Sequence, residues 1–195
     1  TRFKCDWSSD VCSSDLVSLA RLVAKTGKKV LIIDCDLRRP ATSKALGIDK
    51  VSVGLVEVLT GEKSFEECRT KDARSSLHVL PVTLKTGNPP DILGSEAMER
   101  LINKLRTEYD LVVLDTAPLL PVNDTRILAR LIDAAVFVVR WEKTPRDAAR
   151  SAVRILAETH APLTGVVMTR ANSKRFQYYS YGYSSYTSYN KYYTN

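Results

Sequence analysis

The strongest constraint on the fold is a run of consecutive aliphatic residues, Val30 to Ile33, that is followed directly by an acid. A strand that is apolar at every position must be covered on both faces, which is the condition of a central strand in a parallel sheet. A second run of this kind lies at residues 111–115, and helical patterns occupy the sequence between the strands. This alternation is typical of βαβ units. The sequence therefore predicts an α/β protein with a mostly parallel sheet and helices on both faces.

Hydrophobic periodicity gives the expected positions of the other elements. Strands are predicted at residues 29–34, 77–80, 111–115, 134–140 and 165–169. Helices are predicted at residues 17–25, 41–46, 55–59 and 123–132, with another beginning near Ser95 and one opened by Pro145. Gly87 and the pair Pro89-Pro90 predict that residues 83–90 form an ordered surface loop without regular structure.

Composition limits the class of protein. A chain of 195 residues with 44% hydrophobic and 26% charged residues is typical of one soluble globular domain. Its apolar runs are far shorter than the roughly 20 residues that a membrane-spanning helix needs. The net charge of +7 would fit a nucleic-acid-binding protein, but the basic residues are spread over helices and loops. Because no stripe of basic and aromatic residues is present, no nucleic acid partner is expected.

The cysteines point to the cellular compartment. Cys5, Cys12, Cys35 and Cys68 show neither zinc-ligand spacing nor the density of a disulfide scaffold. A reducing cytoplasm is therefore expected.

The first 16 residues, TRFKCDWSSDVCSSDL, differ from the patterned sequence that begins at Val17. They show no helical or strand periodicity. The segment DWSSDVCSSD resembles the translation of a DNA string that is common in sequencing adapters; the alternative is a genuine N-terminus without regular structure. We expect residues 1–16 to be foreign to the native chain, residues 17–172 to form the domain, and residues 173–195 to form a tail.

Acidic residues end both of the strongest predicted strands. Asp34 and Asp36 follow the first strand, and Asp115 ends the strand at residues 111–115. Ligands of open parallel sheets bind beyond the carboxyl ends of the strands, so these carboxylates are candidates for one site. Clustered carboxylates are suited to Mg²⁺ and to a proton-donating hydroxyl, as in phosphoryl transfer. The alternative is that Asp34 and Asp36 only cap the turn after the strand.

The segments VLIIDCDLRRP and LVVLDTAP together resemble two motifs of the bacterial tyrosine kinases, or BY-kinases, which are associated with capsule and exopolysaccharide export. Asp34, Asp36 and Arg38 match a motif in which D-x-D-x-R follows a hydrophobic run. Asp115 and Pro118 match the Walker B motif. The resemblance implies that Asp34 and Asp36 bind Mg²⁺ and act as general base toward a tyrosine hydroxyl. It also implies that Asp115 positions the metal beside ATP.

The resemblance covers nearly all of residues 17–195 and implies a P-loop NTPase-like fold. Gly87, Asn88 and Pro89 are similar to a loop that these kinases also have. The Walker A motif, G-x-x-x-x-G-K-[ST], should end a few residues before Val17, but it is absent. Because its amides and lysine hold the phosphates, we predict that the chain as written binds ATP weakly or not at all, whereas the intact parent is an active kinase. Many P-loop relatives have Asn at the position of Thr169, where it can contact adenine; Asn172 is the alternative, so the residue that contacts adenine stays open.

The C-terminal segment contains eight of the nine tyrosines, and only Tyr109 lies elsewhere. The eight are Tyr178, Tyr179, Tyr181, Tyr183, Tyr186, Tyr189, Tyr192 and Tyr193. A segment that mixes tyrosine with small polar residues and lacks aliphatics is predicted to be disordered. It could be a low-complexity tail, an aggregation-prone segment or an aromatic platform for sugars or single-stranded nucleic acid. The family resemblance implies instead that these tyrosines are phosphoacceptors presented to a neighbouring subunit.

The resemblance also implies the partners and leaves two rival functions. It implies a ring of subunits that phosphorylate one another, located at the inner face of the membrane through a fused or separate chain-length regulator. Within enzymes, the rival is a partitioning or Mrp-like P-loop ATPase, which has no use for a tyrosine tail. Outside enzymes, the rival is a non-catalytic docking subunit of a polysaccharide exporter.

Overall fold

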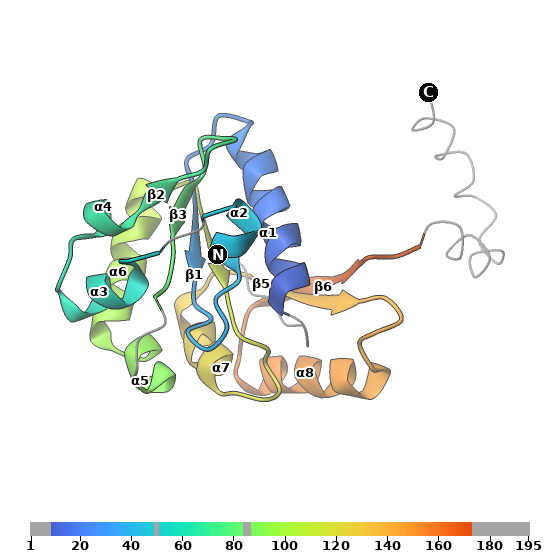
Figure 1. Ribbon diagram of the computed structural model, residues 1–195. Coiled ribbons are helices and arrows are strands. Elements are labelled where there is room, and N and C mark those ends of the chain that lie inside the picture. The colour runs from blue at the N-terminus through green and yellow to red at the C-terminus, as the bar shows by residue number, and fades with distance from the viewer. Residues whose placement is uncertain (1–8, 49–50, 84–86, 173–195) are drawn as a thin grey trace, which may run out of the picture.

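A computed structural model describes residues 9–48, 51–83 and 87–172 of the chain (Figure 1). The strands are β1 (Val30–Asp34), β2 (Thr70–Lys71), β3 (His78–Leu80), β4 (Leu111–Asp115), β5 (Ala135–Arg140) and β6 (Leu163–Thr169). The helices are α1 (Ser9–Ala24), α2 (Thr42–Leu46), α3 (Leu55–Thr60), α4 (Phe65–Cys68), α5 (Pro89–Leu93), α6 (Glu96–Glu108), α7 (Asp124–Leu128), the 3-10 turn η1 (Ala129–Leu131) and α8 (Arg146–Glu158). The eight tail tyrosines lie outside the described residues.

The strands form two sheets. The larger sheet has the order β2-β3-β1-β4, in which β1 is parallel to both β3 and β4, and only β2 is antiparallel. The smaller sheet pairs β5 with β6 in parallel. This arrangement confirms the prediction of an α/β fold with mostly parallel strands.

Alternate residues of β1 belong to two separate cores. Leu31 and Ile33 pack with the side of the sheet that α3 and α6 cover. Val30 and Ile32 pack with α1 on the opposite side (Figure 1). All four side chains are fully buried. A strand buried on both faces requires an unbroken aliphatic run, and this explains the feature that the sequence displays most strongly.

Most predicted elements are confirmed within one or two residues, but the prolines of the expected loop at residues 83–90 behave differently. Pro89 and Pro90 occupy the first turn of α5. The prediction was wrong at these two residues because proline disrupts a helix interior yet suits the first turn, where its missing N–H has no helical partner. The short elements α4 and β2 were not predicted either, since four and two residues carry too little periodicity.

Helix α1 continues without a break across residue 17. Ser13, Leu16 and Val17 are all buried, so the end of the helix that precedes Val17 packs as part of the domain. None of the helices in the described ranges combines the length and the apolar character that crossing a bilayer requires.

Candidate active site

The site lies where β1 and β4 end beside each other. Asp34 and Asp115 are register partners on these adjacent parallel strands. Immediately beyond them, the N–H of Cys35 donates to the carbonyl oxygen of Asp115 at 2.7 Å. Asp36 follows on the same loop, and all three carboxylates are buried. The structure therefore brings the three acids predicted from sequence to one edge of the sheet.

The first two acids are held by the turn that follows β1. Asp34 accepts from the N–H of Asp36 at 3.1 Å and from the N–H of Thr42 at 3.2 Å. Asp36 accepts through Oδ1 from the N–H groups of Arg38 and Arg39, at 3.1 and 2.9 Å. The capping role considered from sequence is thus present in the hydrogen bonds. It leaves Oδ2 of Asp36 with no hydrogen-bond partner within the described residues.

Asp115 is held by two hydroxyl groups. Its Oδ2 accepts from the Ser13 hydroxyl at 2.6 Å and from the Thr42 hydroxyl at 2.7 Å. Ser13 lies in α1 and Thr42 opens α2, so both flanking helices converge on the same oxygen. Thr42 also binds Asp34 through its backbone, and it therefore links the two acids across the strand ends.

Burial dominates the electrostatics of these acids. It raises the pKa of Asp34 well above its ordinary value, and the negative charge of Asp115 raises it further. Burial also raises the pKa of Asp36, although the N–H groups of Arg39 and Arg38 act in the opposite direction. A bound cation would relieve this repulsion, so the donor set fits Mg²⁺.

The carboxylates do not form a closed cage for a metal. No cluster of three or more potential metal-ligating side chains with metal-binding geometry occurs among residues 9–48, 51–83 and 87–172. This is compatible with Mg²⁺ because that ion is commonly held by one or two carboxylates, with water and phosphate oxygens completing its shell.

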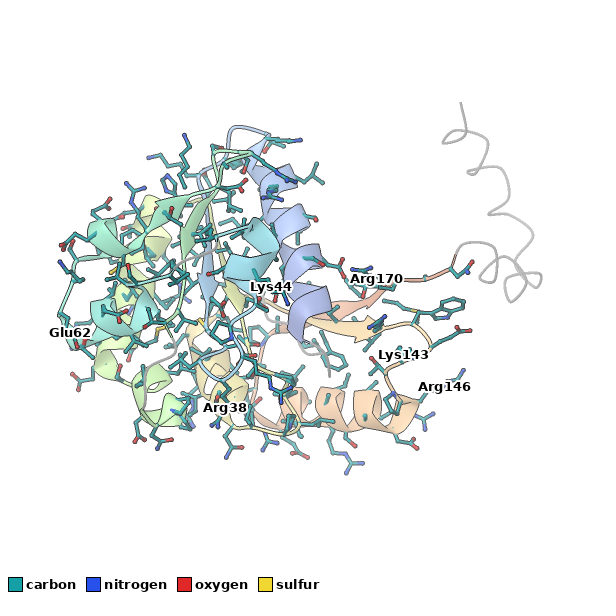
Figure 2. The ribbon with its side chains drawn as sticks, viewed as in Figure 1. Arg38, Lys44, Glu62, Lys143, Arg146 and Arg170 are labelled. Carbon is teal, nitrogen blue, oxygen red and sulfur yellow. The ribbon has the colours of Figure 1, made fainter. Side chains whose placement is uncertain are left out.

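Arg38 binds a residue that sequence reasoning did not single out. Figure 2 labels Arg38. Its guanidinium donates to both oxygens of Asp124, at 2.8 and 3.2 Å, and the Asp124 side chain is almost completely buried. This fork joins the loop after β1 to the first residue of α7. The side chain of Arg38 thus connects two elements.

The remaining predicted residues lie around this edge or outside the described ranges. Pro118 is half-buried in the loop after β4. Asn88 donates to Asp91 at the start of α5. At the end of β6, the Thr169 hydroxyl oxygen is buried and has no hydrogen-bond partner among the residues that the structure describes.

Three residues of the site were missed: Ser13, Thr42 and Asp124. Ser13 and Asp115 are 102 residues apart, and Arg38 and Asp124 are 86 apart. Such pairs carry no local signal. Only Ser13 could have been found, because it lies where the hydroxyl that ends a Walker A motif is expected.

Comparisons with known proteins show which proteins this chain resembles. A family model described as AAA domain matches residues 13–145. The tyrosine-protein kinase YwqD of Bacillus subtilis (strain 168) is 36% identical over 172 residues, which cover 88% of this chain and 71% of YwqD. The succinoglycan biosynthesis transport protein ExoP of Rhizobium meliloti (strain 1021) is 33% identical over 166 residues, which cover 84% of this chain and 21% of ExoP. The crystal structure of the VpsO kinase domain has a TM-score of 0.80 and 33% identity, and the match covers 88% of this chain and 83% of that one.

Proposed function

The chain belongs to the bacterial tyrosine-protein kinase family, and we propose that its intact form transfers the γ-phosphate of ATP to tyrosines of its own C-terminal segment. The observation that carries this proposal is the convergence of Asp34, Asp36 and Asp115 at the ends of β1 and β4. The acceptors are the eight tyrosines of residues 178–193. A partitioning ATPase would share the acids but would not need these tyrosines.

Asp36 is the best-placed general base. Its Oδ2 is not used by the turn, and burial raises the pKa of Asp36 above its ordinary value, which makes this carboxylate a better proton acceptor. In the proposed step, the phenol proton passes to Asp36 while the tyrosine oxygen forms a bond to the γ-phosphorus. The bond from that phosphorus to the β-phosphate oxygen breaks, and ADP leaves with the electron pair.

Asp34 and Asp115 hold the metal in this proposal. Mg²⁺, when bound, would neutralise the charge of the phosphates and of the leaving group. Asp34 is fixed by two backbone N–H groups and Asp115 by two hydroxyls, so both carboxylates are oriented before a ligand arrives. The Ser13 hydroxyl corresponds in its contact with Asp115 to the hydroxyl that ligates Mg²⁺ in a P-loop.

The proposal also covers nucleotide binding and the cellular role. ATP is the proposed cofactor with Mg²⁺, and the Thr169 hydroxyl is a candidate contact for adenine. The relative ExoP is named a biosynthesis transport protein, which supports a role in regulating exopolysaccharide polymerisation and export at the cytoplasmic face of the membrane. A ring of subunits and a membrane-anchored chain-length regulator are the proposed partners.

Rebuilding the phosphate loop tests the function. If Ser13 ends the motif, then Asp6→Gly, Val11→Gly and Cys12→Lys together complete G-x-x-x-x-G-K-S. With γ-labelled ATP and Mg²⁺, we expect label on the tail of the rebuilt protein and little or none on the unchanged chain. Release of free phosphate without labelled protein would indicate an ATPase, and neither product would indicate a docking subunit.

The matched control is the rebuilt protein with Asp36→Asn. This change keeps the Oδ1 acceptor and removes the base, so labelling should fall by at least about 100-fold while nucleotide binding persists. Equal labelling with and without Asp36→Asn would contradict the assignment of the base. A variant with the eight tail tyrosines changed to Phe should bind ATP normally but take up no label on the tail.

A further inference from the structure

A cavity of about 600 Å³ lies beside α7, and its lining does not include Asp34, Asp36 or Asp115. It is bounded by α5, by α7 with η1, and by the C-terminal end of α8, which lie together along one edge of the molecule (Figure 1). Its lining residues are Pro90, Asn123, Arg126, Ile127, Arg130, Glu158, Thr159 and His160. We call it the α7 cavity.

Two arginines, Arg126 and Arg130, line the α7 cavity. Arg126 and Arg130 are four residues apart on α7 and η1, a spacing that brings like charges to one helical face at a cost in stability. Neither has an ion pair or side-chain hydrogen bond in the part of the chain that the structure describes. The Nε of Arg126 is buried and unsatisfied. A buried donor without an acceptor is costly unless a ligand supplies one.

The remaining lining residues narrow the ligand class. Two arginine forks match the oxygens of a phosphate, and His160 also lines the cavity. Pro90 and Ile127 provide apolar surface that an aromatic ring can cover. Glu158 opposes a bare anion but suits a ligand that also carries a positive charge. The lining therefore fits a phosphate, an aromatic ring and a neighbouring cation held together.

The chain itself contains such a ligand if Tyr192 is phosphorylated. Lys191 directly precedes Tyr192, and the other two basic residues of the tail, Lys174 and Arg175, are not adjacent to a tyrosine. We propose that the α7 cavity binds the phosphorylated Lys191-Tyr192 segment of the C-terminal tail. This inference rests on the proposed kinase function, which supplies the phosphotyrosine.

Helix α7 connects the cavity to the loop that carries Asp36. Helix α7 has only five residues, and its first one, Asp124, is joined to Arg38 of the loop that carries Asp36. Arg126 on the same helix faces the cavity. A phosphorylated tail held here would be removed from the acidic site, and its contacts would act on the helix that anchors the aspartate loop.

The test uses a peptide phosphorylated in advance, so its result does not depend on kinase activity. A fluorescent peptide of residues 187–195 with phosphotyrosine at 192 is titrated against the full chain, and anisotropy is measured. We expect it to bind at least about tenfold more tightly than the unphosphorylated peptide. Arg126→Ala and Arg130→Gln should each weaken binding by about tenfold or more. Arg150→Ala, on the exposed surface of α8, is the control and should leave binding unchanged.

A charge exchange separates this site from a general attraction to anions. Glu158→Gln should weaken binding of the phosphopeptide, because it removes the partner of Lys191. It should not weaken binding of a phosphopeptide that carries Lys191→Ala. Equal binding of phosphorylated and unphosphorylated peptides would overturn the proposal, as would equal binding by wild type and Arg130→Gln. Competition by inorganic phosphate at the same concentration as the peptide would also overturn it, because the ring and the lysine would then contribute nothing.

Discussion

At the scale of single residues, the site is defined by carboxylates kept out of water. Asp34 is fully buried and faces the charge of Asp115, so its protonated form is favoured in the folded protein. A carboxylate that served only to cap the turn would be more stable if it were exposed to water. The destabilising charge is therefore a feature of the binding site and not of the fold.

This burial predicts how stability depends on pH. Below the unfolded pKa of Asp34, about 4, the residue is protonated in both states. As pH rises, the unfolded chain loses this proton first, so Asp34 lowers the free energy of unfolding until pH passes the raised folded pKa. We expect Asp34→Asn to gain stability relative to wild type as pH rises from 4 to 8, measured by urea denaturation without Mg²⁺.

The control for this prediction is Asp110, whose pKa is shifted in the opposite direction. The exposed Asp110 accepts from the N–H of Lys29, and this bond lowers the pKa of Asp110. The stability that Asp110 contributes is therefore lost as pH falls. We expect Asp110→Asn to have a lower free energy of unfolding than wild type near neutral pH, and this difference should become smaller toward low pH. Parallel pH profiles for wild type and Asp34→Asn would show that the folded state does not shift the pKa of Asp34.

Thr42 provides a second residue-scale prediction. Its hydroxyl donates to the buried Asp115, and Val has the same shape without the donor. Thr42→Val should lower the free energy of unfolding by about 1–3 kcal/mol, because a buried acceptor loses a partner. Thr42→Ser keeps the hydroxyl and should recover most of the loss. If Val and Ser cost the same in denaturant titrations, the hydrogen bond is not the cause.

At the scale of elements, helices and strands with long hydrophobic patterns could be predicted from the sequence more reliably than short ones. The strand at residues 111–115 was predicted with its observed bounds because a core on either side demands a continuous apolar run. Helix α6 was predicted from Ser95, which caps it, and from the buried stripe Met98, Leu101, Ile102 and Leu105. Contacts between elements could not be predicted, since pairs such as Arg38 with Asp124 depend on how distant segments meet.

Gly54 shows one such meeting of elements. It directly precedes α3, and a Cβ built on it would collide with the carbonyl oxygen of Pro81, the residue that directly follows β3. Gly54→Ala should therefore cost about 2 kcal/mol or more, because backbone must move to admit the methyl group. The matched control is Gly165→Ala in β6, where nothing lies within 4 Å of the added Cβ. Thermal melts should show a clear drop for the first variant and little change for the second; similar melts would refute the collision.

At the scale of the whole molecule, the two sheets are not joined within the described residues. Strand β4 pairs only with β1 on that part of the chain, and β5 pairs only with β6. The β6 strand also leaves Val166, Val167 and Met168 about half exposed. An apolar strand with an open edge favours association with other chains.

This surface gives the last prediction. Val166 and Met168 are two residues apart on β6 and so share one face of the strand. Changing Val166→Thr and Met168→Lys should reduce concentration-dependent association, measured by sedimentation velocity, with little effect on the melting temperature, because both side chains are already half in water. Leu22→Lys is the control: Leu22 is 64% exposed but is isolated on α1. Because association through β6 requires a contiguous apolar strand, a similar reduction by Leu22→Lys would mean that net charge and not this strand controls self-association.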